Sequence, residues 1–395
     1  MKKIISFIVL LAGVISFTSC DNDSTNPYAH ESVIQIVKAD ELTFNSIGGE
    51  SYIEFTAPAN VQITANADWV TLTQQSATRV DVAVTANNDK SDRSAQVTFK
   101  SGADEVIVTV HQLGFVLRID VPESVTYGNA ASSHSFPMNT SGEVTVESDV
   151  DWITAYIDGD NLCYDIAAND QHIWRTGTVT YRSGAYENSI VIRQGEAKDM
   201  VGRNFLIYGV NLLRAVDPED PFSMMMVASV TSTSQVELWF PEDGISGLST
   251  KIKINESDFS VNIVGGGLGK LTKTIYGYLG TYDLTIGAAL WNGNITFKFP
   301  LKYYDVEGFS GYYGELVAQP VMLEGDEYSA DAMAIYKFAD SAYEGNPTGF
   351  FAVYGNCSME EYTGDLDDLE NEEARSIAIK KAKSNAIARR TLGRR

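Results

Sequence analysis

Two stretches of the chain decide its fold: Leu42–Trp69 (LTFNSIGGESYIEFTAPANVQITANADW) and Val125–Trp152 (VTYGNAASSHSFPMNTSGEVTVESDVDW). They align without a gap, and each ends in an Asp-Trp pair followed by a β-branched residue. After a deletion of one residue in the second copy the match resumes: Asn87 with Asn169, Arg93 with Arg175, and Gln112 with Gln194. A match of this length indicates two copies of one domain.

Apolar residues alternate inside each copy, as in Val80–Val84 and Leu162–Ile166. A period of two residues is typical of strands that bury one face. Turn residues such as Gly48-Gly49 and Ser101-Gly102 separate about seven short runs, which predicts an immunoglobulin-like sandwich in each copy. Neither copy has a pair of cysteines, so packing must hold its two sheets together.

The region that follows the repeats is also rich in strand patterns. Gln235–Phe240 and Ile295–Phe299 alternate, and Asn292-Gly293 predicts a two-residue hairpin. Most of the many aromatic residues there are expected in the core or in cross-strand pairs. The predicted fold class is all-β: two tandem immunoglobulin-like β-sandwiches, then a third β-rich domain and a short C-terminal helix.

The predicted boundaries are 1–19 for a signal peptide, 20–37 for a tether, 38–115 and 116–198 for the sandwiches, 199–365 for the β-rich domain and 366–395 for a charged helical tail. In this tail acidic residues come first and basic residues later, the order that a helix dipole favours. The tail is either a solvated helix or a helix that docks onto an acidic surface, its own body included.

The N-terminus has the layout of a signal peptide, with Lys2 and Lys3 before the apolar run Ile4–Phe17. This run of about 14 residues is shorter than the roughly 20 that span a bilayer. The junction Phe17–Cys20 resembles a bacterial lipobox of the Bacteroidetes type, which implies lipid on Cys20 and a place on the outer face of the cell outer membrane. The alternative is an ordinary secretory signal with a chance cysteine.

The recurring pattern Asp-Trp, Asn, Arg, Ser-Gly and a final Gln resembles the BACON domain of Bacteroidetes proteins. The resemblance covers Asp40–Gly114 and Ser124–Gly195. It implies a role in carbohydrate binding or as a spacer, and it does not decide between the two.

The charge of the chain excludes one class of partner. The formal net charge is −23, and it becomes −31 for the body once the two lysines of the signal and the tail 371–395, with eight basic and two acidic residues, are removed. Such a body repels nucleic acid and acidic polymers. For the same reason neutral sugars are expected, with binding that depends weakly on salt.

Four residues are candidates for contact with a glycan. Trp174 lies in a loop, and its counterpart in the first copy is Asp92, so we expect it to be exposed and free to stack on a sugar beside His172 and Arg175. Arg175 also recurs as Arg93, which favours a structural hydrogen bond to a loop carbonyl. Trp69 and Trp152 are expected in the cores. Trp291 is the candidate in the third domain.

No catalytic, metal or cofactor site is predicted. None of the four histidines lies in the third domain, and the glycine run 265–267 lacks the residues of a P-loop. A pair of carboxylates remains possible there, with these candidates: Glu219, Asp220, Glu242, Asp243, Glu315, Glu324 and Asp326.

The sequence therefore predicts an outer-surface lipoprotein that binds glycans or adheres to a host or cell-surface protein. Two alternatives stay open: a glycoside-active enzyme that uses a carboxylate pair, and a purely structural stalk or adhesin subunit.

Overall fold

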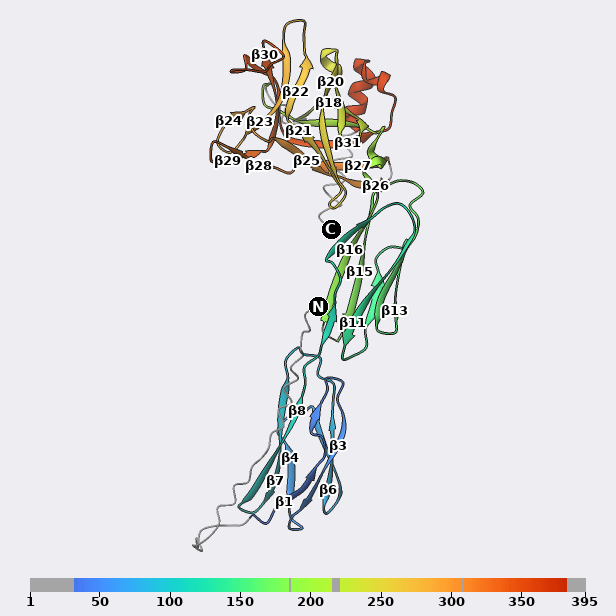
Figure 1. Ribbon diagram of the computed structural model, residues 1–395, viewed down its shortest axis with the longest axis vertical. Coiled ribbons are helices and arrows are strands. Elements are labelled where there is room, and N and C mark those ends of the chain that lie inside the picture. The colour runs from blue at the N-terminus through green and yellow to red at the C-terminus, as the bar shows by residue number, and fades with distance from the viewer. Residues whose placement is uncertain (1–31, 185, 215–220, 307, 382–395) are drawn as a thin grey trace, which may run out of the picture. The chain divides into compact units, whose positions relative to one another are not determined.

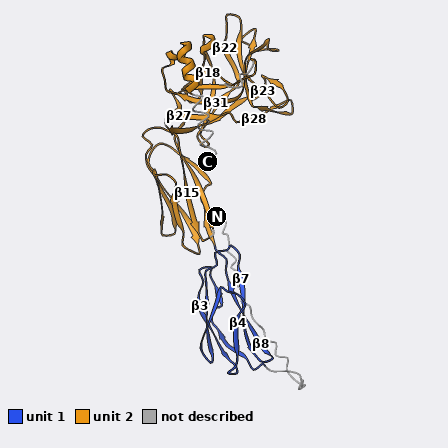
Figure 2. Cartoon of the chain, turned by 180° about the vertical axis from the view of Figure 1, so that it is seen from behind, with its two compact units in different colours: residues 1–115 blue, residues 116–395 orange. Residues whose placement is uncertain are grey.

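The computed structural model describes residues 32–184, 186–214, 221–306 and 308–381. The chain divides into two compact units, Met1–Phe115 and Val116–Arg395 (Figure 2). The first unit contains the first sandwich. The second contains the other sandwich together with the β-rich domain.

The first sandwich consists of eight strands in two sheets (Figure 1). One sheet has the order β1-β3-β6-β5 and the other β2-β8-β7-β4. The strands are β1 (Gln35–Ala39), β2 (Thr43–Phe44), β3 (Gly49–Thr56), β4 (Gln62–Ala65), β5 (Val70–Ser76), β6 (Arg79–Val84), β7 (Arg93–Ser101) and β8 (Asp104–Gln112). Alternate residues of both sheets meet in the core, where Phe55 packs on Phe99 with ring centroids 5.0 Å apart.

The second sandwich repeats this pairing strand for strand, with sheets β9-β11-β14-β13 and β10-β16-β15-β12. Even the short parallel pair recurs, because Phe44 lies opposite Gln112 and Tyr127 opposite Gln194. The all-β fold class is confirmed. The strands are β9 (Leu117–Ile119), β10 (Ser124–Tyr127), β11 (Ser132–Thr140), β12 (Thr145–Ser148), β13 (Ile153–Asp158), β14 (Asn161–Ile166), β15 (Arg175–Ser183) and β16 (Tyr186–Gln194).

A buried glutamine joins the two sheets of each sandwich. In the first, the Nε2 of Gln112 donates to the carbonyls of Asn45, Ser46 and Thr85 at 3.1, 3.3 and 3.0 Å. Its Oε1 accepts from the Nε of Arg93 at 2.8 Å. Thr85 directly follows β6 of the opposite sheet. We call this arrangement the glutamine–arginine lock.

The lock recurs in the second sandwich, where Gln194 donates to four loop carbonyls and accepts from Arg175 at 2.9 Å. In both copies the arginine also covers the core tryptophan, with its guanidinium carbon 4.4 Å from the ring centroid of Trp69 or Trp152. Both tryptophans are partly buried against their cores. Their expected packing role is confirmed.

The third domain is built on one sheet with the path β22-β23-β30-β31-β17-β18-β19-β20-β21-β25. Of its other strands, β24 pairs with β23, β27 pairs with β31, β26 pairs with β27, and β28 and β29 form a separate hairpin. The bounds are β17 (Asn204–Asn211), β18 (Phe222–Ser232), β19 (Gln235–Phe240), β20 (Ile245–Asn255), β21 (Ser260–Val264), β22 (Gly266–Lys270), β23 (Tyr276–Asp283), β24 (Ala288–Leu290), β25 (Thr296–Pro300), β26 (Lys302–Val306), β27 (Phe309–Glu315), β28 (Gln319–Leu323), β29 (Asp326–Ala330), β30 (Ala332–Phe338) and β31 (Gly349–Tyr362).

This sheet curls around its own core. β22 returns to lie beside β20, and a Cβ on Gly269 would be 3.6 Å from Leu248. The core contains, among others, Phe205, Leu238, Val261, Phe297 and Phe299.

The hairpin predicted at Asn292-Gly293 is wrong. Gly293 does turn the chain, with φ of 95°, but β24 pairs with β23 whereas β25 pairs with β21. Burial decides the partner of β25, because its Phe297 and Phe299 lie opposite Ile263 and Val261 in the core. A turn signal alone does not carry that information.

The described part of the tail docks onto the third domain. After the short helix η3 (Leu366–Leu369), residues 372–381 form an α-helix whose first turn is capped by Asn371, which accepts the N–H groups of Glu373 and Ala374. Ala378 and Ile379 pack on the apolar cluster around Leu369. Residues 382–395 lie outside the described residues.

The lock generates a stability prediction. Gln112→Leu keeps the volume but removes the hydrogen bonds that the buried amide makes to Arg93 and to the three carbonyls, so we expect a loss of about 2–4 kcal/mol in the free energy of unfolding. Gln96→Leu, the same change on an exposed side chain of β7, is the control and should alter stability by no more than roughly 0.5 kcal/mol. Denaturant unfolding of the chain lacking residues 1–20 measures both, and equal effects would contradict the role of the lock.

Candidate functional site

Trp174 does not lie on the surface. Its side chain is 3% exposed and belongs to the core of the third domain, where it stacks on Phe259 with ring centroids 4.7 Å apart. Its backbone N–H donates to the hydroxyl of Tyr312 at 2.6 Å, and its Nε1 donates to the carbonyl of Glu196 at 2.9 Å. The expectation of an exposed Trp174 that stacks on sugar is therefore wrong.

The physical reason lies in the position of its loop. In the first sandwich the counterpart Asp92 accepts the N–H of Gly114 at 2.8 Å and completes its own loop. In the second sandwich the same loop faces the third domain, which supplies the apolar surroundings that a tryptophan needs. The change from Asp to Trp thus marks a buried joint between domains.

His172 and Arg175, the expected neighbours of Trp174 in a sugar site, have structural partners. The Nδ1 of His172 lies 3.1 Å from Oδ1 of the buried Asp199 and 2.9 Å from Nδ2 of Asn129, although the imidazole is 56% exposed. Arg175 donates to the carbonyls of Ala167 and Ala168. The structural hydrogen bond to a loop carbonyl that the repeat favoured is confirmed, and the three residues form no common sugar-binding surface.

A different surface, which we call the aromatic face, lies on the third domain. Along β23 the tyrosines Tyr276, Tyr278 and Tyr282 occupy alternate positions on the outer side of the sheet and are half-buried. Residues between them, such as Leu279, point into the core. Alternation along one strand therefore places three phenol rings on one face.

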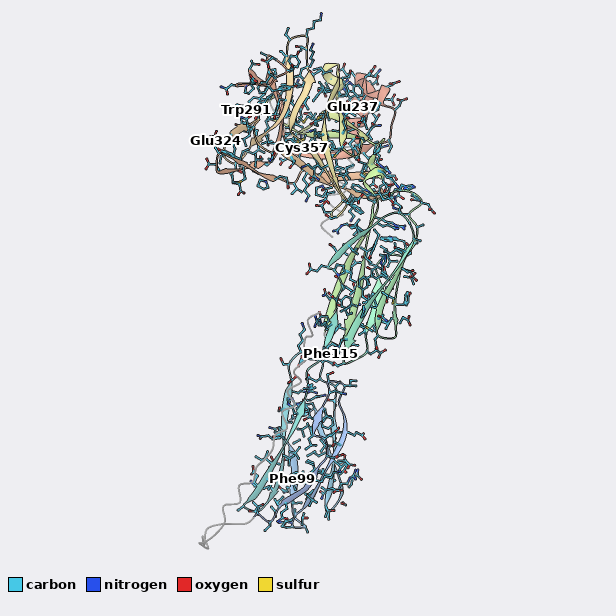
Figure 3. The ribbon with its side chains drawn as sticks, in the orientation of Figure 1. Phe99, Phe115, Glu237, Trp291, Glu324 and Cys357 are labelled. Atoms are coloured by element: carbon cyan, nitrogen blue, oxygen red, sulfur yellow. The ribbon has the colours of Figure 1, made fainter. Side chains whose placement is uncertain are left out.

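Neighbouring strands and loops extend this face. β31 contributes the half-buried Phe350, and the connecting loops contribute Trp291 and Tyr343 (Figure 3 labels Trp291). Tyr336 and Phe338 of β30 are 1% and 2% exposed and form the buried support on which these rings pack. The rings touch in series, with Trp291 on Tyr336 at 5.6 Å and Tyr343 on Tyr278 at 5.3 Å between centroids. Trp291 thus lies in a candidate binding surface.

Tyr343 is held at the edge of the aromatic face by unusual means. Its backbone adopts a left-handed conformation, with φ of 55°, which is strained for a non-glycine residue. Its hydroxyl accepts the N–H of Gly269 at 3.1 Å, and its ring lies so close to Gly267 that a Cβ there would be 2.3 Å from it. Gly267 is required for this ring position.

Burial affects the chemistry of two phenols of the face. It raises the pKa of Tyr278 and the pKa of Tyr336. The charge interaction with the nearby Tyr343 raises the pKa of Tyr278 further. Both phenols are therefore neutral at pH 7.

A polar pocket adjoins the aromatic face at Gly267. It has a volume of about 630 Å³ and lies where β21 diverges from β20 and the glycine run 265–267 leads into β22. Ser249, Thr250 and Lys251 line its other wall, and Gln235 lies at its end. We call it the fork pocket. Flat rings beside a few polar groups are the usual elements of a small-molecule site.

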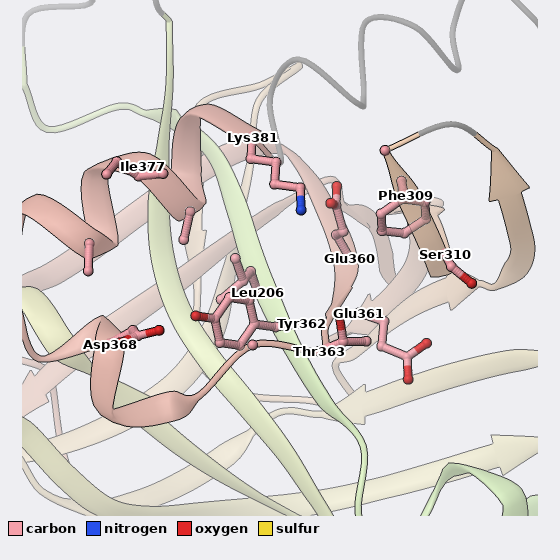
Figure 4. Close-up of a pocket in the computed structure, with 14 residues that line it drawn as sticks. Leu206, Phe309, Ser310, Glu360, Glu361, Tyr362, Thr363, Asp368, Ile377 and Lys381 are labelled. Atoms are coloured by element: carbon pink, nitrogen blue, oxygen red, sulfur yellow. The ribbon is translucent and has the colours of Figure 1, made fainter.

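A second pocket of about 450 Å³ lies between the C-terminal helix and β31 (Figure 4). Its two buried carboxylates support the fold. Glu360 accepts from the hydroxyl of Tyr208 at 3.1 Å, and Glu361 pairs with Arg203 at 2.6 Å and accepts the N–H of Tyr312 at 3.0 Å.

The carboxylates considered for catalysis are distributed over several elements. Glu242 and Asp243 lie in η2 (Pro241–Asp243), and Glu315 accepts from Tyr313 at the end of β27. Glu324 lies in the β28–β29 turn, and Asp326 is the first residue of β29. Glu219 and Asp220 lie outside the described residues. Among the residues that the structure describes, no group of three or more His, Cys, Asp or Glu side chains could hold a metal ion. Nor does this part of the chain contain a helix long and apolar enough to span a membrane.

The buried joint generates the second prediction. Trp174→Ala should lower the free energy of unfolding of the second unit by about 3–5 kcal/mol, because it empties a packed site. Tyr156→Ala on the surface of the same sandwich, where the side chain is 40% exposed, is the control and should have a much smaller effect. Thermal unfolding followed by circular dichroism compares the two. An unchanged melting temperature for Trp174→Ala would contradict the joint.

Comparison with known proteins adds the family of one domain. Residues 50–113 match the family BACON, described as "Putative binding domain, N-terminal". A search of curated proteins finds no match. Similar solved structures include the I9–I11 tandem of titin, with 12% identity over 41% of this chain and 66% of that one and a TM-score of 0.29.

Two glycoside hydrolases also align in part. An endo-fucoidan hydrolase of family 107 has 12% identity over 44% of this chain and 29% of its own, with a TM-score of 0.23. A Bacteroides ovatus family 5 xyloglucanase in complex with a heptasaccharide has 23% identity over 25% of this chain and 22% of its own, with a TM-score of 0.19. This chain thus spans less than a third of either enzyme. The family match covers one of its parts: residues 50–113, most of the first sandwich, are similar to the BACON family.

Proposed function

We propose that this protein is a polysaccharide-binding protein of the cell surface, in which the two sandwiches are spacers and the third domain carries the binding site. The observation that carries the proposal is the aromatic face with the fork pocket at its edge. Half-buried rings on a sheet offer flat apolar area, and little side-chain entropy is lost when a ligand covers them.

The sandwiches suit a spacer role because their recurring polar residues are engaged within the fold. Gln112, Gln194 and their arginines are hydrogen-bonded to one another within the lock. Trp174 of the second sandwich packs on Phe259 of the third domain. Side chains that are already engaged in contacts within the protein are not available to bind a ligand. Binding is therefore assigned to the third domain.

The aromatic face also separates the proposal from its rivals. A glycoside-active enzyme needs two carboxylates at a set separation beside the sugar, and no described carboxylate lines the fork pocket. A purely structural stalk does not need a row of half-buried aromatic rings that face outward, because exposed apolar surface usually marks an interaction site. Adhesion to a protein remains the alternative use of this face.

The proposed place of the protein rests on Cys20, which lies outside the described residues. The short apolar run and the acidic residues after the cysteine support a lipid anchor in the outer membrane. Cys20→Ala should release the protein from the membrane fraction. Fractionation of cells with fatty-acid labelling measures this, and an unlabelled protein that stays with the membrane would contradict the anchor.

Binding by the aromatic face is tested on a glycan array with the chain lacking residues 1–20. Tyr343→Ala and Gly267→Ala should each weaken binding about fivefold, because one removes and the other displaces an aromatic contact worth on the order of 1 kcal/mol. Tyr156→Ala, a tyrosine on the second sandwich, is the matched control and should bind as the unaltered chain does.

Two results would contradict this proposal. One is binding that tolerates both substitutions on the aromatic face while the melting temperature is unchanged. The other is release of reducing ends from a bound polysaccharide that stops when a single Asp or Glu is replaced, which would establish an enzyme.

A further inference from the structure

The fork pocket differs in charge from the rest of the molecule. Among its lining residues, all of them within the described ranges, Lys251 alone is charged, and the others are hydroxyl, amide, glycine and valine residues. The whole chain has 52 acidic residues against 29 basic ones. A pocket lined by a lysine and no carboxylate is therefore a local exception to an acidic protein.

The fork also leaves room and backbone groups for a ligand. The β20–β21 ladder ends at the pair Ile252–Ile263, beyond which the two backbone segments separate. Thr250 bridges the base of the gap, because its hydroxyl donates to the carbonyl of Val264 at 2.7 Å. A Cβ on Gly266 would meet no heavy atom within 4 Å.

The carboxylates on neighbouring elements do not line the pocket. Glu237 on β19 lies opposite Ser249, two residues along β20 from Lys251, yet it is not part of the lining. Asp340 and Glu344 belong to the loop of Tyr343 and also lie outside it. On the aromatic side, the ammonium group of Lys270 lies 5.7 Å from the ring centroid of Tyr276 and adds a second positive charge.

We propose that the fork pocket binds the anionic substituent, a carboxylate or a sulfate ester, of a polysaccharide whose sugar rings lie on the aromatic face. This inference rests on the proposed function and names its ligand class. Lys251 would pair with the anion, and Ser249 and Gln235 would donate hydrogen bonds to its oxygens.

The inference replaces the expectation of neutral sugars drawn from the net charge. At physiological ionic strength the field of distant surface charges is screened over about 8 Å, so a lysine in direct contact outweighs carboxylates farther away. The net charge of a protein governs its long-range encounters. The groups inside the pocket govern which ligand stays bound.

The test measures the affinity of the chain lacking residues 1–20 for four polymers: polygalacturonate, carboxyl-reduced polygalacturonate, dextran sulfate and dextran. We expect one or both anionic polymers to bind more tightly than their neutral forms, and the pair that differs identifies carboxylate or sulfate as the anion. Lys251→Gln should weaken that binding roughly tenfold, the scale of one charge-assisted hydrogen bond. Added salt should weaken it as well.

Lys253→Gln is the matched control. Lys253 is exposed on the same strand two residues later and lies outside the pocket, so its loss removes the same charge without the proposed contact. Equal effects of the two substitutions, or equal affinity for an anionic polymer and its neutral form, would overturn the inference. If the chain bound the neutral polymers equally well and Tyr343→Ala weakened that binding, the proposed function would stand and the inference of an anionic ligand would not. Binding that tolerates Tyr343→Ala, or no binding to any of the polymers or to the array, would overturn both.

Discussion

The glutamine–arginine lock is the interaction on which each sandwich depends. An immunoglobulin-like domain without a disulfide needs another link between its sheets, and a buried glutamine that donates to the carbonyl of Thr85, which follows a strand of the opposite sheet, provides it. Once Gln112 is buried, its Oε1 needs a donor, because an unsatisfied buried acceptor costs about 1–3 kcal/mol. Arg93 is that donor, and its guanidinium in turn covers Trp69. The glutamine and the arginine thus recur together in both copies because each supplies the hydrogen-bond partner that the other needs.

Where the copies differ, the second sandwich has acquired a new contact. Asp92 closes its own loop, whereas Trp174 at the same position packs among Phe259 and Tyr312 of the third domain. Asn129 and Asp199 add a buried polar contact beside it, at 2.9 Å. A single loop position therefore converts a self-contained sandwich into the support of another domain, while the framework that holds the loop stays unchanged.

Sequence reasoning predicted what depends on local pattern and failed where distant residues meet. The repeat and the alternation predicted both sandwiches and the structural role of Arg175. They did not predict that Trp174 is buried, because the surface that covers it lies beyond residue 200. Tyr343 and the fork pocket had no signal either, since the ring rests on Gly267 and Gly269, the latter 74 residues away in the sequence. Net charge is a sum over the whole chain, so it carries no information about a single pocket such as this one, which a lysine lines without a carboxylate.

In the function that we propose, the aromatic face and the pocket at its edge would perform different parts of polymer recognition. The rings would supply affinity that varies little with the identity of the sugar, because apolar contact with a ring face requires no particular substituent. The pocket would supply selection, since a polar site left unpaired by the wrong substituent penalises binding. Each contact on an open face is weak, yet copies held together on one membrane would engage a long chain at several points, which raises the overall affinity without any new contact. A surface anchor, spacers and an open aromatic face are thus complementary, because multiple attachment compensates for the shallowness of the single site.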